Sequence, residues 1–397
     1  MILNLIFAYV LKKLAFFPME RMPAFVIWVY SIVWEQYKGE LYMDFLKDLL
    51  AALSVILNGL PQGLLALSFG FASVPTAFAF IVGAVGCLAF GVVAPVSFQA
   101  ETITLAGTMG KNMKERISMV MLGAIGMAII GTFGLLENIV DFIGPSITSG
   151  MMAGVGIMLA RVAIDMARKN KSVGFSSIAI SFITYMITKD LVYTIALSVI
   201  ISSIVALILK QKSDIDISER EKIVFQKPII NISVIRGALA MICLNIGANI
   251  AFGKITGNIA NIDVNIDHLS IVSSLADLAS AMFGGGPVES IISATGGAPH
   301  PLMSGVLMMV LMAAILFAGL LPKMAKYIPS ESIAGFLFVL GAIVTVPVNA
   351  MAALNVIDVP GGAIVGGITM TVTAITDPFF GMLAGVIFKA FAAALGM

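Results

Sequence analysis

The chain alternates long apolar runs with short polar interruptions, and this pattern predicts a series of membrane helices. A helix needs about 20 consecutive apolar residues to cross a bilayer. Most runs reach this length, but the third and the tenth do not. The predicted helices cover 45–68, 75–93, 97–108, 116–136, 145–167, 173–188, 191–209, 230–252, 268–283, 287–297, 302–321, 330–354, 361–376 and 378–396.

The two short segments begin with related motifs. Residues 95–101 read PVSFQAE and residues 287–293 read PVESIIS. Each motif places a carboxylate in an apolar segment that is too short to span, and discontinuous helices of this kind point to the binding site of a secondary transporter. We expect two half-helices that begin after the prolines and direct their free N–H groups at one central point.

Other motifs recur in the same order in both halves of the chain. GLL occurs at 134–136 and 319–321, IGPS at 143–146 is matched by IPS at 328–330, and LNG at 57–59 is matched by LNIG at 244–247. These echoes predict an all-α polytopic membrane protein with 14 transmembrane segments in a 7+7 inverted repeat. The repeats cover 44–212 and 229–397, and residues 213–228 form a polar loop between them.

Residues 1–43 precede the repeat as an N-terminal extension that could hold an extra membrane segment. A signal peptide and an over-long start ahead of Met43 are the alternatives. Lysines and arginines gather on the loops after helices 3, 5, 7 and 11, so the positive-inside rule places these loops in the cytoplasm. The 14-helix core would then start and end outside, unless the extension supplies one more helix.

Composition confirms the class of protein. Apolar residues make up 59% of the 397 positions and charged residues 11%, whereas soluble domains carry about 25% charged residues. The sequence therefore predicts a multi-pass protein of the cell membrane, surrounded by the lipid bilayer. The net charge of +1 gives no reason to expect a nucleic acid as a partner. Cys87 and Cys243 lie in apolar runs, and their spacing indicates neither a disulfide nor a metal site.

The sequence resembles the nucleobase–ascorbate transporter family (xanthine, uracil and hypoxanthine–guanine permeases), which shares its fold with sulfate permeases. The resemblance covers 44–397 and rests on FGGGP at 283–287, IGPS at 143–146, AGVGI at 153–157 and TAITDP at 373–378. It implies a uracil-permease-like fold and a symporter that takes up a purine or pyrimidine nucleobase by alternating access. It also implies a core of helices 1–4 and 8–11, a gate of helices 5–7 and 12–14, and a homodimer as a candidate assembly.

The sequence departs from that family at two positions. The acid expected in helix 8, three residues before Gly247, is replaced by Leu244. The glutamate of helix 10 would fall near Ser293, whereas this chain has Glu289 one turn earlier. The motif at 287–293 also resembles sulfate permeases, so an anion transporter of that kind is the alternative. Two glutamates beside the short helices argue against a dianion.

Glu289 is the first candidate for substrate binding and for proton coupling. A charge at the centre of a membrane helix costs about 2.5–3.5 kcal/mol on insertion scales, so such residues are usually functional. Glu289 is expected to hydrogen-bond substrate N–H groups or to take up the coupled proton, with Ser290 beside it and Ser293 one turn further on the same face. The alternative is that Glu289 caps helix 10. The Glu289→Gln change is expected to abolish uptake without unfolding the protein.

The other candidates lie in helices 3 and 8. Gln99 is a candidate for substrate binding and Glu101 for proton coupling, although Glu101 could instead pair with Lys111 or Lys114. Asn245 and Asn249, four residues apart on one helical face, could bind substrate or join helices. Weaker candidates are Asn58, Thr102 and Thr295.

The coupling ion is expected to be H⁺, because the candidate groups are carboxylates, with Na⁺ as the alternative. An intramembrane enzyme would need a nucleophile–base pair or a metal cluster at membrane depth. The only two histidines, His268 and His300, lie at predicted helix ends. The sequence therefore predicts a transporter without a cofactor or a metal rather than an enzyme.

Overall fold

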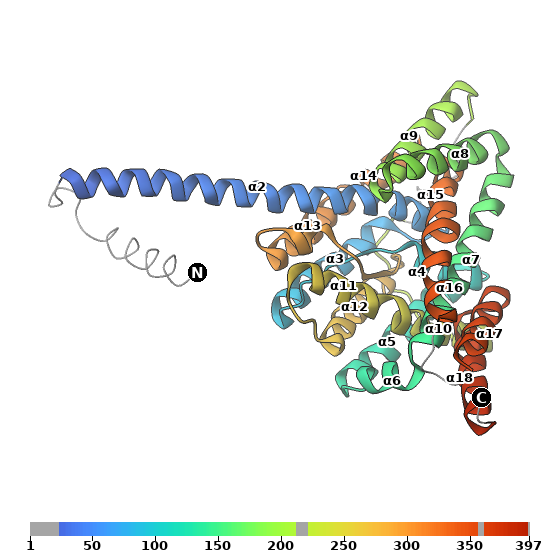
Figure 1. Ribbon diagram of the computed structural model, residues 1–397. Coiled ribbons are helices and arrows are strands. Elements are labelled where there is room, and N and C mark those ends of the chain that lie inside the picture. Colours follow the sequence, from blue (N-terminus) through green and yellow to red (C-terminus); the bar gives the residue numbers. More distant parts are fainter. Residues whose placement is uncertain (1–23, 212–220, 356–360, 396–397) are drawn as a thin grey trace.

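The computed structural model describes residues 24–211, 221–355 and 361–395, with side chains from residue 43 onward. Helices surround two short strands at the centre of the molecule (Figure 1). The first half contains α2 (Ala24–Ser68), α3 (Ser73–Phe90), β1 (Val96–Phe98), α4 (Ala100–Met109), α5 (Met113–Thr132), α6 (Leu136–Ile143), α7 (Pro145–Lys169), α8 (Lys171–Thr188) and α9 (Leu191–Ile208).

The second half follows the same order with more irregular helices. It contains α10 (Ile232–Leu244), the π-helix η2 (Asn245–Asn249), α11 (Ile250–Ala260), α12 (Ile266–Ala281), β2 (Val288–Ser290), the 3₁₀ turn η3 (Ala294–Gly297), α13 (Pro301–Phe317), α14 (Leu320–Ala325), the 3₁₀ turn η4 (Ser330–Ile333), α15 (Ala334–Phe338), the π-helix η5 (Val339–Thr345), α16 (Val346–Leu354), α17 (Gly362–Ile375) and α18 (Pro378–Ala394).

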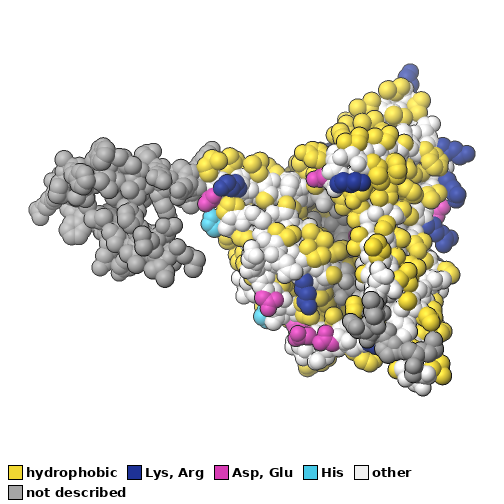
Figure 2. All heavy atoms as spheres, viewed as in Figure 1, with side chains coloured by type: hydrophobic (Ala, Val, Ile, Leu, Met, Phe, Trp, Pro, Cys, Tyr) yellow, Lys and Arg dark blue, Asp and Glu magenta, His cyan; other side chains and the backbone are white. Residues whose placement is uncertain are grey.

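The chain is a multi-pass integral membrane protein, as the sequence predicts. Among the described residues, seven helical segments are long and apolar enough to cross a bilayer, and three more apolar helices are shorter. Hydrophobic side chains spread over wide areas of the face seen in Figure 2, and Ile187 and Ile232 are 78% and 86% exposed. Such a surface requires lipid rather than water around it. The predicted extension falls in two parts: residues 1–23 lie outside the described residues, and residues 24–42 continue α2 away from the body of the molecule (Figure 1).

The prediction of a helix over 287–297 is wrong. Val288–Ser290 forms a strand, and only Ala294–Gly297 makes a single 3₁₀ turn. Backbone groups in a membrane must find partners within the protein, and here β1 and the Thr256 side chain supply them. The Thr256 hydroxyl donates to the Ile291 carbonyl at 2.8 Å and accepts from the Ser293 N–H at 3.0 Å. The glycines of the turn and the prolines that follow disfavour any extension into an α-helix.

The predicted helix over 97–108 also begins with a strand, and α4 starts at Ala100. β1 and β2 pair antiparallel, with Ser97 opposite Glu289, Val96 opposite Ser290 and Phe98 opposite Val288. Ser97 and Glu289 each stand two residues after the proline of their motif. Corresponding positions of the two motifs therefore face each other, as an inverted pair of segments requires.

Two short helices, α6 and α14, are absent from the sequence-based prediction, which assigned their residues to the preceding helices or to loops. Each follows a glycine with left-handed backbone, Gly134 at φ 64° and Gly319 at φ 61°. Glycine adopts this conformation without steric cost, so it ends one helix and redirects the chain into the next. These glycines open the repeated GLL motif, which therefore marks the same turn in both halves.

The helices pack in two groups, which we name by their members. The strand group consists of α2–α5 and α10–α13 with β1 and β2, in which α12 packs on α3 and α5, and α13 packs on α2 and α3. The flanking group consists of α7–α9 and α15–α18, in which α7 packs on α16 and α17, and α8 packs on α9 and α15. The groups meet mainly where α10 contacts α18 and where α2 contacts α9.

The glycines of α7 face other helices of the flanking group. A Cβ at Gly150 would stand 2.6 Å from the Gly366 carbonyl oxygen of α17, and a Cβ at Gly156 would stand 3.0 Å from the Gly341 oxygen of η5. The glycines therefore bring helices of the flanking group together. Against the strand group, α7 instead places Met151, which contacts Gly247 of η2.

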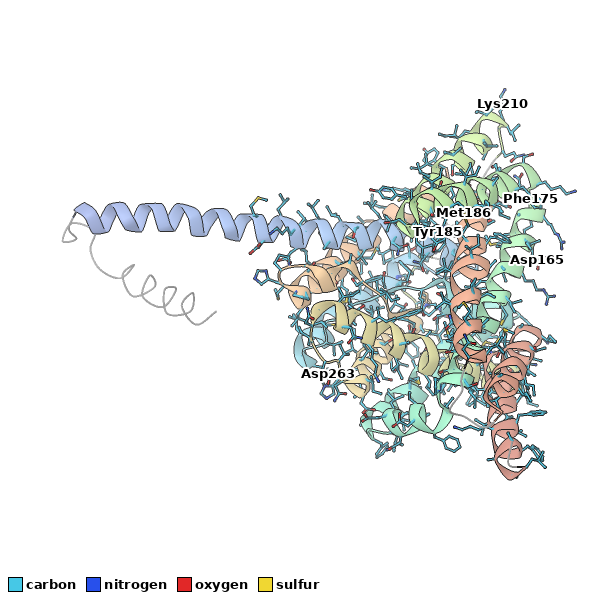
Figure 3. All side chains as sticks on the ribbon, viewed as in Figure 1. Asp165, Phe175, Tyr185, Met186, Lys210 and Asp263 are labelled. Carbon is cyan, nitrogen blue, oxygen red and sulfur yellow. The ribbon has the colours of Figure 1, made fainter. Side chains whose placement is uncertain are left out.

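Charged residues separate to opposite ends of the helices. One end, the basic face, carries the α7–α8 turn and the loops after α4, α9 and α13. Its members include Lys111, Lys114, Arg168, Lys169, Lys171, Lys210, Lys222, Lys227, Lys323 and Lys326. The other end, the acidic face, includes Asp44, Glu137, Asp141, Asp190, Asp263 and Asp267. Lys210 and Asp263 mark the two ends in Figure 3.

Candidate functional site

The paired strands carry a cluster of buried polar atoms that have no hydrogen-bond partner among the described residues. Buried polar groups are normally bonded, and an unpaired one costs free energy. The unpartnered atoms belong to both strands and to the helices that flank them. They are Ser97 Oγ, Ser290 Oγ, Glu289 Oε1, Gln99 Nε2, Asn58 Oδ1 and Asn249 Oδ1.

α2 approaches β1 closely because two glycines lie on one of its faces. A Cβ at Gly59 would stand 3.0 Å from Ser97 Oγ, and a Cβ at Gly63 would stand 2.9 Å from the Phe98 ring. Any larger residue at these positions would have to push the strand away. The LNG motif of the first helix therefore positions β1, a role that sequence analysis did not assign to it.

The N-terminus of α4 opens beside the strands. Gln62 of α2 holds it in place by accepting the Ala100 N–H at 2.8 Å, while Gln99 Oε1 accepts the Thr102 hydroxyl at 2.7 Å. The Gln99 Nε2 donor is left free. A helix N-terminus carries partial positive charge and favours anions. Gln99 therefore stands where the sequence placed it, at the start of the half-helix, and offers a donor there.

Glu289 turns toward α12 rather than along a helix of its own. The Ser273 hydroxyl donates to Glu289 Oε2, and Asn245 and Asp277 stand beside the same carboxyl group. Glu289 is 1% exposed and accepts no capping bond from its own segment, so the alternative of a helix cap does not describe it.

A small polar cavity lies against Glu289. It is lined by Glu289, Asn245, Asn249 and three serines of α12, namely Ser270, Ser273 and Ser274, with apolar side chains closing it. Its volume of about 10 Å³ is close to that needed by a single water molecule. Both asparagines therefore line this cavity. They also bond each other, Asn249 Nδ2 donating to Asn245 Oδ1 at 2.7 Å.

The structure separates other candidates from this cluster. Ser293 caps the η3 turn, accepting the Thr295 N–H at 3.2 Å, and its hydroxyl lies 2.6 Å from the Thr295 hydroxyl. It shares no helical face with Glu289, because the segment is not an α-helix. Glu101 is buried in the first turn of α4. It forms no ion pair among the described residues, so the alternative of a pairing with Lys111 or Lys114 is absent from this part of the chain.

Sequence analysis missed Asp277, Ser273 and Gln62. Asp277 is 1% exposed and its Oδ1 accepts the Val288 N–H at 2.7 Å, which fixes the start of β2. A signal was present, because Asp277 is the lone acid in the second half of a predicted membrane helix, and acids at membrane depth are functional candidates by default. Gln62 gave no signal, since its role depends on where α4 begins.

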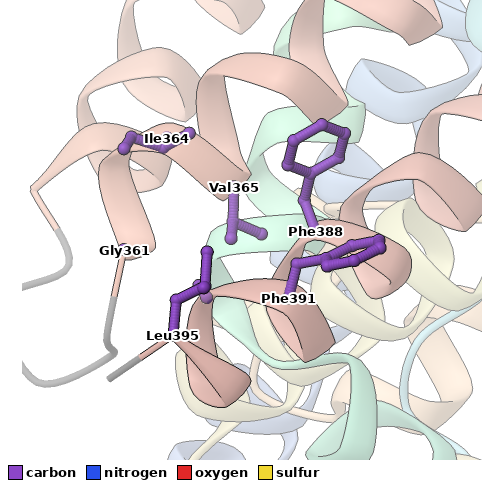
Figure 4. A pocket seen from close by; sticks show the side chains of 7 residues that line it. Gly361, Ile364, Val365, Phe388, Phe391 and Leu395 are labelled. Carbon is purple, nitrogen blue, oxygen red and sulfur yellow. The ribbon is translucent and has the colours of Figure 1, made fainter. Parts of the chain in front are cut away.

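An apolar cavity of about 380 Å³ lies between α17 and α18, lined by Val365, Phe388 and Leu395 among others (Figure 4). No charged or hydrogen-bonding side chain lines it. It therefore offers nothing that could recognise a polar substrate.

Comparisons with known proteins give a fold and no family. No protein-family model matches the sequence, and no curated protein sequence matches it. Among solved structures, the chain is similar to the transmembrane domain of a cyanobacterium bicarbonate transporter, BicA. The TM-score is 0.62 at 14% identity, covering 88% of this chain and 97% of that one.

The chain is also similar to the murine Solute Carrier 26 family member A9 (Slc26a9) anion transporter in the inward-facing state. The TM-score is 0.65 at 13% identity, covering 88% of this chain and 68% of that one. A further structure of SLC26A9 gives a TM-score of 0.64 at 15% identity, covering 89% of this chain and 66% of that one. The chain therefore shares the fold of these membrane transporters.

The predicted membership of the nucleobase–ascorbate family is wrong, because these similar structures are anion transporters. The motifs on which the prediction relied shape turns and helix contacts rather than a substrate pocket. Gly144 and Pro145 begin α7, and Asp377 caps α18 by accepting the Phe380 N–H at 3.1 Å. Motifs of this kind follow the fold and do not identify the substrate.

Proposed function

We propose that this protein is a secondary transporter that moves a small anion across the membrane by alternating access. The observation that carries the proposal is the set of unpartnered donors at the crossing of β1 and β2, directly beside the N-terminus of α4. The likeness in fold to BicA and Slc26a9, which are named for bicarbonate and anion transport, supports the same function.

The chemistry of the crossing suits an anion with acceptor oxygens. Ser97 and Ser290 each offer a hydroxyl and Gln99 offers an amide donor, while the α4 dipole adds partial positive charge. Charge-assisted hydrogen bonds to such an anion are stronger than bonds between neutral groups.

The buried carboxyl groups decide which anion can bind. Glu289 and Glu101 would repel an anion if both were ionised, as the sequence already indicated for a dianion. A monovalent anion accompanied by a proton avoids this repulsion. We therefore propose anion–proton symport, with Na⁺ as the alternative coupling ion.

Alternating access is proposed to occur between the two helix groups. In this arrangement the strand group carries the site as the core, the flanking group acts as the gate, and the halves form the 7+7 inverted repeat. Met151 of α7 packs on Gly247 beside the asparagine pair, so the gate covers the site. The cavity of about 10 Å³ has no room for the anion, and entry therefore requires the groups to separate.

The proposal is tested by thermal unfolding of the purified protein with chloride, bicarbonate, sulfate, uracil or xanthine. A ligand at 100 times its Kd stabilises the native state by about 2.7 kcal/mol. At least one of the three anions is expected to raise the melting temperature, whereas uracil and xanthine are expected to leave it unchanged. A rise with a base alone would overturn the proposal.

The Ser290→Ala variant tests the site itself. Loss of one hydrogen bond to a charged group costs about 1.5–3 kcal/mol. The anion concentration that gives the same thermal shift should therefore rise by about 10-fold or more. Ser181→Ala is the matched control, because Ser181 Oγ is likewise buried and unpartnered but lies in α8 of the flanking group. An equal loss of anion binding in both variants would contradict the assignment of the site.

A further inference from the structure

Two carboxyl groups meet in the centre of the strand group, and only Glu289 belongs to the predicted site. Asp277 comes from α12, and both residues are 1% exposed. Each is held by a separate bond: Asp277 Oδ1 accepts the Val288 N–H at 2.7 Å, and Glu289 Oε2 accepts the Ser273 hydroxyl. Ser273 and Asp277 lie one turn apart on α12, and Val288 and Glu289 are neighbours in β2, so these two bonds bring the two carboxyl groups side by side.

Two carboxylates in contact cannot both carry a charge at this depth without strong repulsion. No basic side chain contacts either carboxyl group among the described residues, since the ion pairs there involve other residues. A proton on one of the two groups removes this repulsion, because a protonated carboxyl group is neutral. The pair therefore favours the binding of at least one exchangeable proton.

The neighbouring elements bring other charged or titratable groups, but these lie elsewhere. They are Cys87, Glu101, Lys114, Glu115, Arg116, Glu137, Asp141, Lys254, Asp267 and His268 on α3 to α6, α11 and α12. Only Cys87, Glu101 and Glu115 are buried. Cys87 donates to the Ala94 carbonyl and Glu115 accepts the Lys111 N–H, while Glu101 lies on α4.

The pair occurs in one half of the chain only. The helices α3 and α12 occupy matching places in the two halves. When both are counted from their first residue, Asp277 of α12 corresponds to Ala84 of α3, and Ser273 of α12 corresponds to Phe80 of α3. Ser97 of β1 faces Glu289 from the matching position. A pair needed only to hold the strands in place would be expected in both halves. Its restriction to one half indicates a function.

A polar stripe on α12 connects the pair to the acidic face. Asp267, Ser270, Ser274 and Asp277 recur at helical spacing on one side of α12. Asp267 is half-exposed at the acidic face, and the serines line the small cavity that reaches Glu289. Hydroxyl groups can both accept and donate a proton. The stripe therefore offers a route for protons between the acidic face and the pair.

We propose that Asp277 and Glu289 together carry the coupling proton, with Asp277 as the partner that makes Glu289 a reversible carrier. This inference rests on the proposed anion transport. In the outward-open state a proton from water at the acidic face enters along the α12 stripe, and one carboxylate becomes a carboxylic acid. The anion then binds at the strand crossing. After the groups move, anion and proton leave toward the basic face and the carboxylate is restored.

The test measures anion accumulation in proteoliposomes driven by a pH gradient alone. With one proton per anion, a gradient of one pH unit supports about tenfold accumulation in the wild-type protein. The Asp277→Asn variant is expected to accumulate none above the equilibrium level, yet to bind the anion in the thermal assay and to exchange internal for external anion. Uncoupled exchange with retained binding is a result that a merely structural role for Asp277 would not give.

Asp190→Asn is the matched control, because Asp190 also accepts a backbone N–H, that of Val192 at 2.6 Å, but lies at the start of α9 in the flanking group, outside the α12 stripe. It should keep most of the pH-driven accumulation. If Asp277→Asn fails to fold, Ser273→Ala takes its place; it keeps both carboxyl groups and should shift the pH dependence of exchange.

The outcomes separate the two proposals. Full pH-driven accumulation by Asp277→Asn, or an unchanged pH dependence in Ser273→Ala, would overturn the inference and leave anion transport intact. Accumulation in the wild-type protein driven by a Na⁺ gradient and not by pH would also overturn it. Absence of any anion binding or exchange in the wild-type protein would instead refute the proposed function.

Discussion

At the scale of single residues, the site depends on where each side chain points. Glu289 was recognisable from sequence because a lone acid in an apolar segment stands out. Its position beside Ser273 and Asp277 of α12 was not, because the strand at 288–290 turns Glu289 toward α12. The predicted helix would instead have placed Glu289 on one face with Ser293. Residue type thus identified the candidate, and the local backbone, which the sequence did not reveal, decided its partner.

Gln62 gives a prediction at this scale. Its side-chain oxygen accepts the Ala100 N–H at 2.8 Å. The residue is buried, with 8% of its surface exposed. Gln62→Leu keeps the volume and leaves that N–H buried without a partner, which costs about 1–3 kcal/mol. We expect a lower melting temperature and weaker anion binding, because the α4 N-terminus loses its anchor. Gln226→Leu serves as the control, because its amide bonds the Val224 carbonyl two residues away in an exposed loop; equal melting temperatures of the two variants would contradict this role.

At the scale of elements, most spanning helices follow directly from the apolar pattern, and the exceptions have two causes. The segment 287–297 has a strand because its hydrogen-bonding partner, β1, lies about 190 residues earlier in the chain. No local periodicity records such a partner. The short helices α6 and α14 were missed because each apolar run continues across the glycine that separates the two helices.

The crossing of α7 and η5 gives a prediction for elements. A Cβ at Gly341 would stand 2.5 Å from the Gly156 carbonyl oxygen and 2.8 Å from the Ala160 nitrogen, and both contacts are backbone. Neither atom can move away without separating the helices, so Gly341→Ala should lower the melting temperature by several degrees. Gly367→Ala, where the nearest atom is a Leu354 methyl at 3.8 Å, should change it little. Equal effects of the two substitutions on the melting temperature would contradict a close backbone contact between Gly341 and α7.

At the scale of the whole molecule, composition was enough to predict a multi-pass membrane protein, and the repeated motifs were enough to locate the two broken segments. The substrate class could not be predicted in the same way. Glycine and proline motifs determine turns and close helix contacts that transporters of nucleobases and of anions can share. The residues that distinguish substrates, such as Ser97 and Ser290, are common amino acids that gain meaning only where the strands cross.

The separation of charge between the two faces predicts the orientation. Basic residues are retained in the cytoplasm, so the loop at Lys210 should lie inside and the turn at Asp263 outside. In intact cells, Asp263→Cys should react with a membrane-impermeant thiol reagent, and Lys210→Cys should react only after permeabilisation. Both side chains are exposed, and the native Cys87 and Cys243 give the background to subtract. The reverse labelling pattern would show that the positive-inside rule does not govern this chain.

The most direct test of the account is transport itself. Purified protein in proteoliposomes would be given labelled chloride, bicarbonate or sulfate, with uracil and xanthine in parallel, under an inward proton gradient. The account predicts accumulation of at least one anion, its loss in Ser290→Ala and its retention in Ser181→Ala, with no accumulation of either base. Accumulation of a nucleobase without any anion would contradict it.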